Sequence, residues 1–199
     1  MDSPLEFRAD THQYFLEGVE LPSVTRITRF LSVDVATQAR PWLREAAARR
    51  GSAVHAACEA LDYGLEPEAT PETAPYLSAY RDFLRDYRVR GWLGVELPMG
   101  SLSLGYAGTA DRVGIIDGQL SVVDLKSGST LHTPSLTAQL TGYATLYHNL
   151  YGAFPTALYG LHLRRDRRYT LRPIPYDPAL FDACRKLHDT LSPKKGAIS

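Results

Sequence analysis

The spacing of apolar residues predicts helices in the first half of the chain and strands in the middle. Apolar side chains recur with helical periodicity over about residues 41–61, and a second helix is predicted over 76–88. From residue 92 the pattern changes to strand-like runs bounded by Gly, Ser or Asp-Gly turn signals. These runs cover 92–99, 103–116 and 119–126, and they are followed by helices at 133–150 and 178–191 with strands at 156–164 and 168–173 between them.

The N-terminal segment predicts a short β-hairpin, with strands over residues 5–10 and 13–16. Ser23 is a candidate N-cap for a helix over 24–31, and Thr133 followed by Pro134 is a candidate cap and first residue of the later helix. Strands and helices follow one another without a repeat or a long linker. The predicted fold is therefore α/β, with a central mixed β-sheet flanked by helices.

The size and composition favour one globular domain over residues 1–199, because 44% of the 199 residues are hydrophobic and 22% are charged. No run of about 18 apolar residues occurs, and the N-terminus lacks the features of a secretory signal, so we expect a cytoplasmic protein outside the membrane. Cys58 and Cys184 lack paired ligand spacing, and we interpret both as buried thiols rather than zinc or iron-sulfur ligands.

The net charge of zero provides no general attraction to nucleic acid, so a polyanionic partner requires local basic patches. Two patches are candidates: one contains Arg40, Arg44, Arg49 and Arg50, and the other contains Arg164, Arg165, Arg167 and Arg168. Solvated charge on an exposed helix or turn explains each patch as well as phosphate contact does.

An Asp-Gly turn at residues 117–118 predicts how the two strands on either side of it pair. If these are the two loop residues, Ile116 faces Gln119, and the same register places Asp111 opposite Asp124 and Thr109 opposite Lys126. Facing carboxylates destabilise a sheet unless a cation neutralises them, and such oxygen ligands suit Mg²⁺ or Mn²⁺. The alternative is that Asp124 and Lys126 form an ordinary exposed face, because a lone D-x-K is common by chance.

Five ordered motifs resemble the RecB-type and phage-type exonuclease branch of the PD-(D/E)xK nuclease superfamily, whose core is restriction-endonuclease-like. The N-terminal H-x-Y and S-V-T segments, at 12–14 and 23–25, are similar to the start of phage-type members. The motifs are R-G-S-A-V-H at 50–55, V-E-L-P at 95–98, G-T-A-D-R-V at 108–113, V-V-D-L-K-S-G at 122–128 and Q-L-T-G-Y at 139–143. Each motif is weak alone, but the order of the set is specific.

The resemblance implies that Asp111 and Asp124 bind Mg²⁺ or Mn²⁺ and that Lys126 positions or activates the attacking water. It adds His55 and the Leu125 carbonyl as metal ligands; without it, His55 is more simply a core or surface residue. It also implies that Gln139 and Tyr143 orient the site, whereas helical periodicity alone makes Tyr143 a core aromatic. Glu96 occupies the family's strand glutamate position, as a ligand or as a support for one.

These features lead us to expect a Mg²⁺- or Mn²⁺-dependent deoxyribonuclease, and an exonuclease acting in DNA recombination, repair or replication. We expect Arg49, Arg50 and the 164–168 arginines to contact phosphates. RNA as the substrate, a protein partner in a recombination or replication system, and any oligomeric state remain open. Two alternatives are a non-catalytic nucleic-acid-binding or assembly module on a nuclease-like fold, and a restriction-type endonuclease.

Overall fold

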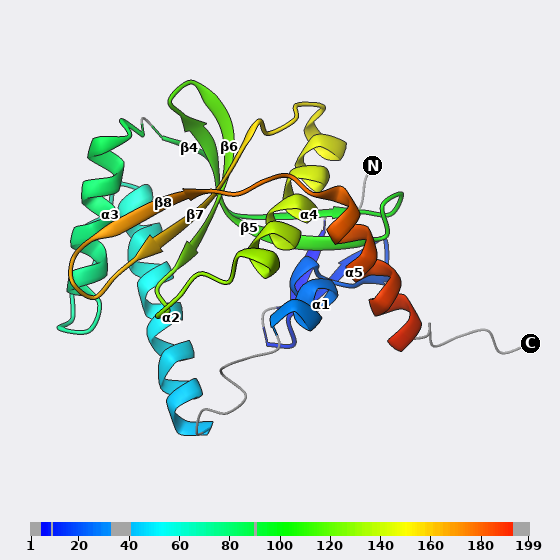
Figure 1. Ribbon diagram of the computed structural model, residues 1–199, viewed down its shortest axis with the longest axis horizontal. Helices are drawn as coiled ribbons and strands as arrows, with labels where there is room; N and C mark the ends of the chain where they lie inside the picture. Colours follow the sequence, from blue (N-terminus) through cyan, green and yellow to red (C-terminus); the bar gives the residue numbers. More distant parts are fainter. Residues whose placement is uncertain (1–4, 9, 33–40, 90, 193–199) are drawn as a thin grey trace, which may run out of the picture.

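The computed structural model describes residues 5–8, 10–32, 41–89 and 91–192, which form a five-stranded mixed sheet with helices on both faces (Figure 1). The strand order is β4-β5-β6-β7-β8, and only β6 and β7 run parallel. The strands are β4 (Trp92–Ser101), β5 (Tyr106–Ile116), β6 (Gln119–Lys126), β7 (Ala157–Leu163) and β8 (Tyr169–Pro173). The predicted α/β class with a central mixed sheet is confirmed.

Apolar side chains on β6 alternate between two hydrophobic cores, which explains why helices cover both faces of the sheet. Val122 packs into a core with helices from the C-terminal half and α1, whereas Val123 and Leu125 pack into a core with α2 and α3. A central strand that is buried on both faces needs such a continuous apolar run. The helices are α1 (Val24–Thr28), the 3₁₀ helix η1 (Arg29–Ser32), α2 (Pro41–Asp62), α3 (Ala74–Asp86), α4 (Thr133–Tyr151) and α5 (Pro178–Leu191).

A small N-terminal sheet of three antiparallel strands lies beside β5. The sequence predicts only the first two of these strands, as a hairpin. The strands of the sheet are β1 (Glu6–Arg8), β2 (Gln13–Leu16) and β3 (Val19–Leu21). The third strand follows a turn at Glu17 and Gly18, both of which have a positive φ. The amide of Ala107 in β5 donates to the Pro22 carbonyl at 3.0 Å, so the small sheet is hydrogen-bonded to the main sheet.

The two predicted helix starts have different outcomes. Ser23 caps α1 as predicted, because its hydroxyl oxygen accepts a hydrogen bond from the Arg26 amide at 3.1 Å. The predicted cap at Thr133 is wrong by one residue: His132 is the cap of α4, and its Nδ1 accepts from the Ser135 amide at 3.4 Å. Sequence patterns identify a helix more reliably than its terminal residue.

The β5–β6 hairpin has the register that the Asp-Gly turn predicts over five residue pairs. Ile116 faces Gln119, and the paired ladder continues to Arg112 opposite Val123. The sequence also predicts that Asp111 faces Asp124 and that Thr109 faces Lys126. The hydrogen-bonded ladder ends one position before Asp111 and Asp124, so neither of these two pairs belongs to it. The Asp111 side chain takes the place of the next backbone partner and accepts a hydrogen bond from the Leu125 amide at 2.7 Å.

Both cysteines are buried, as the sequence predicts, and they are free thiols. In the described ranges, no helix combines the length and apolar character that crossing a bilayer requires.

Candidate metal centre

Three acidic residues occupy matching positions on three neighbouring strands. Across β4 and β5, the pairs on either side of Glu96 and Asp111 are in register, which places these two residues opposite each other. Asp124 follows the last β5–β6 pair and is the next position in that register. Glu96 has a φ of 45°, an uncommon conformation for a residue with a side chain. The sheet therefore places three carboxylates together, and the register of the β5–β6 hairpin predicts two of them, Asp111 and Asp124.

His55 of α2 lies next to this row of carboxylates. Its Nδ1 lies 3.6 Å from Glu96 Oε1 and 3.8 Å from Asp111 Oδ2, and its Nε2 lies 3.1 Å from the Leu125 carbonyl oxygen. Because a carbonyl can only accept, this contact requires Nε2 to carry a proton. The lone pair of a neutral His55 then faces the carboxylates. Burial opposes protonation, but Glu96 and Asp111 outweigh it and raise the pKa of His55.

Asp111 lies at the centre of the row and titrates abnormally. Burial, followed by the nearby negative charge of Asp124, raises the pKa of Asp111 to about 6. His55 and Lys126 act in the opposite direction without cancelling these two effects. A carboxylate whose pKa is raised by burial and by a second acid is typical of a functional site, because buried like charges are unfavourable and are seldom placed together by packing alone.

Asp124 is the most deeply buried of the acids, since its side chain is only 1% exposed. Lys126 Nζ forms an ion pair with Asp124 Oδ2 at 2.5 Å. Neither carboxylate oxygen of Asp124 has a hydrogen-bond partner within the described ranges. Burial opposes the charge of Lys126, but Asp124 and Asp111 outweigh it and raise the pKa of this lysine, whose side chain remains 40% exposed. Lys126 therefore stays charged beside two acids.

The donor set fits a divalent cation with a preference for oxygen ligands. His55, Glu96 and Asp111 each offer one ligand atom, and these atoms lie within 4.8 Å of one another. The buried oxygens of Asp124 are available on the same strand row, although Asp124 is not part of that compact group. Three carboxylates and one imidazole suit Mg²⁺ or Mn²⁺. The Leu125 carbonyl, which the family resemblance makes a metal ligand, accepts a hydrogen bond from His55 Nε2 and so helps to orient the imidazole.

A buried arginine that sequence reasoning missed supports the acidic row from behind. Arg112 is fully buried, and its Nη1 donates to Glu96 Oε1 at 3.2 Å and to the Asp111 carbonyl at 2.6 Å. Its Nε donates to Asp62 Oδ2 at 2.5 Å. Asp62 also accepts hydrogen bonds from Tyr80 and Trp92, both at 2.7 Å. Arg112 therefore holds two members of the metal centre, and Asp62 neutralises it.

A sequence signal for Arg112 exists, although it is indirect. In β5 the arginine alternates with Asp111 and Val113, so that it points to the face opposite those two residues. A charge within a strand that is buried on both faces requires a counter-ion. Asp62 supplies that charge from the end of α2, a helix that α3 and β4 separate from β5 along the chain.

Gln139 and Tyr143 of α4 have different environments. Gln139 Nε2 donates to the Tyr143 hydroxyl at 3.2 Å, and Gln139 lines a hollow of about 180 Å³ together with Lys126. Tyr143 is buried in the core, as helical periodicity predicts, and so is Tyr147. Burial raises the pKa of Tyr143, and the charges of Asp111 and Asp124 raise it further. The Tyr143 hydroxyl thus remains protonated near the carboxylates.

Each of the two predicted basic patches contributes one arginine to the same hollow. Arg50 of α2 and Arg165 of the β7–β8 turn line the same hollow of about 340 Å³, together with Glu72 and Tyr76. The Nε atom of Arg50 is buried there without a hydrogen-bond partner among the described residues.

The remaining arginines of the patches lie outside that hollow. Arg164 and Arg168 both pair with Asp166, at 3.6 and 2.9 Å. Arg167 occupies the turn with a φ of 65°, and Arg49 is exposed. Arg40 lies outside the described residues, as does the side chain of Arg44.

Comparisons with known proteins identify the fold alone. No protein-family model matches the sequence, and no curated protein matches it. The crystal structure of a "Putative exonuclease" from Eubacterium rectale superposes with a TM-score of 0.50 at 12% identity, over 71% of this chain and 64% of that one. The crystal structure of SSO0001 gives a TM-score of 0.37 at 15% identity, over 61% of this chain and 58% of that one. The chain thus spans less than two thirds of the length of either protein.

Proposed function

We propose that the chain is a metal-dependent nuclease that hydrolyses phosphodiester bonds in DNA, with Mg²⁺ or Mn²⁺ held by His55, Asp111 and Asp124. The observation that carries this proposal is the burial of Asp124 with both carboxylate oxygens lacking hydrogen bonds. An ionised carboxylate in such surroundings is costly unless it coordinates a cation or is fully hydrogen-bonded. Lys126 pairs with one of the two Asp124 oxygens, and a shared divalent cation would satisfy the other.

The residues around the cation site have distinct roles in this mechanism. A divalent cation bound there would polarise the scissile phosphate and lower the pKa of its bound water. Lys126 keeps its proton and places a positive charge beside the attacking water and the phosphate. Glu96 adds a third carboxylate, held by Arg112, and Gln139 lies beside Lys126 in the adjoining hollow. Tyr143 supports Gln139 through its hydroxyl.

The basic residues near Arg50 supply phosphate contacts away from the cation. Arg50 and Arg165 share one hollow and form the core of this surface, and we extend it to the exposed Arg49 and to Arg167. Arg164 and Arg168 contribute less because Asp166 already neutralises part of their charge. Such contacts bind the backbone without reading the sequence, and they weaken as salt rises.

We propose further that residues 1–199 form a single nuclease domain and that the enzyme is an exonuclease acting in recombination, repair or replication of DNA. The exonuclease name of the Eubacterium rectale structure supports the same class. RNA as a substrate is tested by including an RNA strand of the same sequence in the assay below.

The test is digestion of linear DNA labelled at each end, single- and double-stranded, and of circular DNA, with Mg²⁺, Mn²⁺ or EDTA. Progressive release from ends that requires the metal supports the proposal, and discrete fragments from circular DNA overturn the exonuclease part. Lys126→Ala and Asp124→Asn should each lower the rate by at least about 100-fold. Lys186→Ala, an exposed lysine of α5, is the matched control and should cleave normally. Binding of DNA without degradation by the wild type would contradict the proposal and identify a non-catalytic module.

A further inference from the structure

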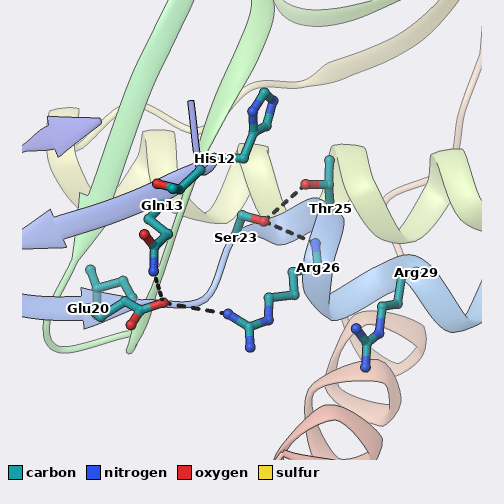
Figure 2. A pocket seen from close by; sticks show the side chains of 9 residues that line it. His12, Gln13, Glu20, Ser23, Thr25, Arg26 and Arg29 are labelled. Carbon is teal, nitrogen blue, oxygen red and sulfur yellow. Dashed lines mark hydrogen bonds and ion pairs between the residues drawn. The ribbon is translucent and has the colours of Figure 1, made fainter. Parts of the chain in front are cut away.

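Another polar hollow lies between the N-terminal sheet and α1. It has a volume of about 490 Å³ and is lined by Gln13, Glu20, Ser23, Thr25, Arg26 and Arg29, among others. Figure 2 shows Gln13 and Glu20 on the strands facing Arg26 of α1, with Arg29 next along the chain at the start of η1. We refer to this site as the N-terminal hollow. The nuclease mechanism proposed above uses none of its residues.

The N-terminal hollow has a net positive charge, because its lining contains two arginines and one carboxylate. Arg26 Nη1 lies 3.6 Å from Glu20 Oε1, and both side chains are about half exposed, so solvent and salt screen this pair strongly. Arg29 makes no ion pair with any residue in the described ranges, and its guanidinium lies over the Phe30 ring. A guanidinium that is held in place but not neutralised is available for an anion.

Hydroxyl and amide groups complete the lining of the N-terminal hollow. Ser23 Oγ lies 3.0 Å from Thr25 Oγ1, and Gln13 Nε2 donates to Glu20 Oε1 at 3.1 Å. Glu20 is thus held by Gln13 from the neighbouring strand and by Arg26 from α1. Guanidinium groups together with hydroxyls form the donor set that contacts nucleic-acid phosphates most often. An apolar ligand would find little to bind in this lining.

The N-terminal hollow is rigidly connected to the strand that carries Asp111. Tyr14, the neighbour of Gln13, is buried, and its hydroxyl lies 2.8 Å from Thr109 Oγ1, two residues before Asp111 in β5. Ser23 itself forms a β-bridge with Ala107 of the same strand. A chain of direct contacts therefore fixes the hollow relative to the metal centre. A ligand that spans both sites would meet a constant separation.

We propose that the N-terminal hollow binds a backbone phosphate of the same nucleic-acid strand whose scissile phosphodiester lies at the metal centre. This inference rests on the proposed nuclease function and adds a second phosphate site to it. Arg26 and Arg29 supply the charge, and Ser23 and Thr25 supply hydroxyl contacts. The Glu20 carboxylate weakens the site, because it competes with the phosphate for Arg26.

Equilibrium binding of a fluorescein-labelled 20-nucleotide single strand in EDTA tests the hollow without cleavage. The double variant Arg26→Ala/Arg29→Ala should bind about 5- to 10-fold more weakly, and the slope of log Kd against log salt should fall by roughly one to two. Glu20→Gln should bind more tightly than the wild type, because it removes the competing charge. The control is Arg81→Ala/Arg85→Ala, two exposed and ion-paired arginines of α3, which should bind like the wild type.

Cleavage kinetics with Mn²⁺ provide the second measurement. The Arg26/Arg29 double variant should raise KM with kcat within about twofold, because the metal centre is intact and only uniform binding is lost. Unchanged affinity and salt slope in a variant that melts like the wild type would overturn the inference, as would weaker binding by Glu20→Gln. If the wild type binds DNA through these arginines but never cleaves it, the nuclease proposal fails and the phosphate site stands. Loss of binding in the α3 control to the same extent would show a general charge effect and contradict the inference.

Discussion

Replacing the central acid of the metal centre should stabilise the metal-free protein while destroying its function. Burial and the charge of Asp124 raise the pKa of Asp111 from 3.8 to about 6. The folded state therefore binds this proton more tightly than the unfolded chain does. As the pH rises from about 4 to about 6, the unfolded chain releases the proton first, and the free energy of unfolding falls. At pH 7 the full cost is present. Asp111→Asn removes that cost.

The size of the effect follows from the shift in pKa. Each unit corresponds to about 1.4 kcal/mol, so a shift of about two units sets an upper limit near 3 kcal/mol. The Leu125 amide, which donates to the Asp111 carboxylate at 2.7 Å, would keep a partner in the variant because an asparagine side chain also carries a carbonyl oxygen. We expect Asp111→Asn to raise the free energy of unfolding at pH 7 by about 1–3 kcal/mol, which is an increase in Tm of about 2–12 °C for a chain of this length.

The assay is thermal and urea denaturation in EDTA between pH 4 and pH 8. The advantage of Asp111→Asn should reach its full size by pH 7 and should fall to a small remainder at pH 4, where Asp111 is protonated in the folded state and about half protonated in the unfolded chain. Asp117→Asn, at the exposed hairpin turn, is the matched control and should show no such dependence on pH. Added Mn²⁺ should raise the Tm of the wild type but not that of Asp111→Asn. A variant that is less stable than the wild type at pH 7 in EDTA would refute the electrostatic reasoning.

Three further predictions concern residues around the metal centre. Arg112→Met should lower the free energy of unfolding by about 3–5 kcal/mol in urea denaturation, because it leaves Asp62 as an uncompensated buried charge. Adding Asp62→Asn to this variant should restore part of the lost stability. An unchanged free energy of unfolding in Arg112→Met would contradict the role of the Arg112–Asp62 ion pair. Gly108→Ala should cost about 1–3 kcal/mol in the same assay, because a Cβ there would lie 2.7 Å from Tyr143 Cε1, and a neutral result would mean that the ring moves freely. Burial raises the pKa of Cys58 to about 12, so a disulfide reagent at pH 8 should modify it only at the rate of unfolding, and rapid modification of the native protein would be inconsistent with this burial.

The sequence predicts the β5–β6 hairpin well because a local signal determines it. The Asp-Gly turn holds Asp117 and Gly118 at positive φ, and every pair of the ladder then follows by counting residues. The predicted helix at 178–191 is confirmed, and the structure shows that Asp177 caps it and Pro178 begins it. Local chemistry determines both features, so a single sequence is enough to find them.

The position of Glu96 opposite Asp111 could not be predicted by counting residues from a turn. The connection between β4 and β5 has no two-residue turn, and the Gly105 amide closes it on the Ser101 carbonyl instead. The register between these strands therefore depends on packing rather than on a turn residue. The pairing of Arg112 with Asp62 and the meeting of Arg50 with Arg165 are also tertiary. They depend on where α2 and the β7–β8 turn lie against the sheet, which periodicity does not specify.

The most direct test of the metal centre is a crystal grown or soaked with Mn²⁺ and measured at the manganese absorption edge. We predict an anomalous peak between His55 and Asp111, within bonding distance of Asp124, and the loss of that peak in Asp124→Asn. A well-ordered crystal with no peak beside Asp111, or with manganese bound only elsewhere, would contradict the account.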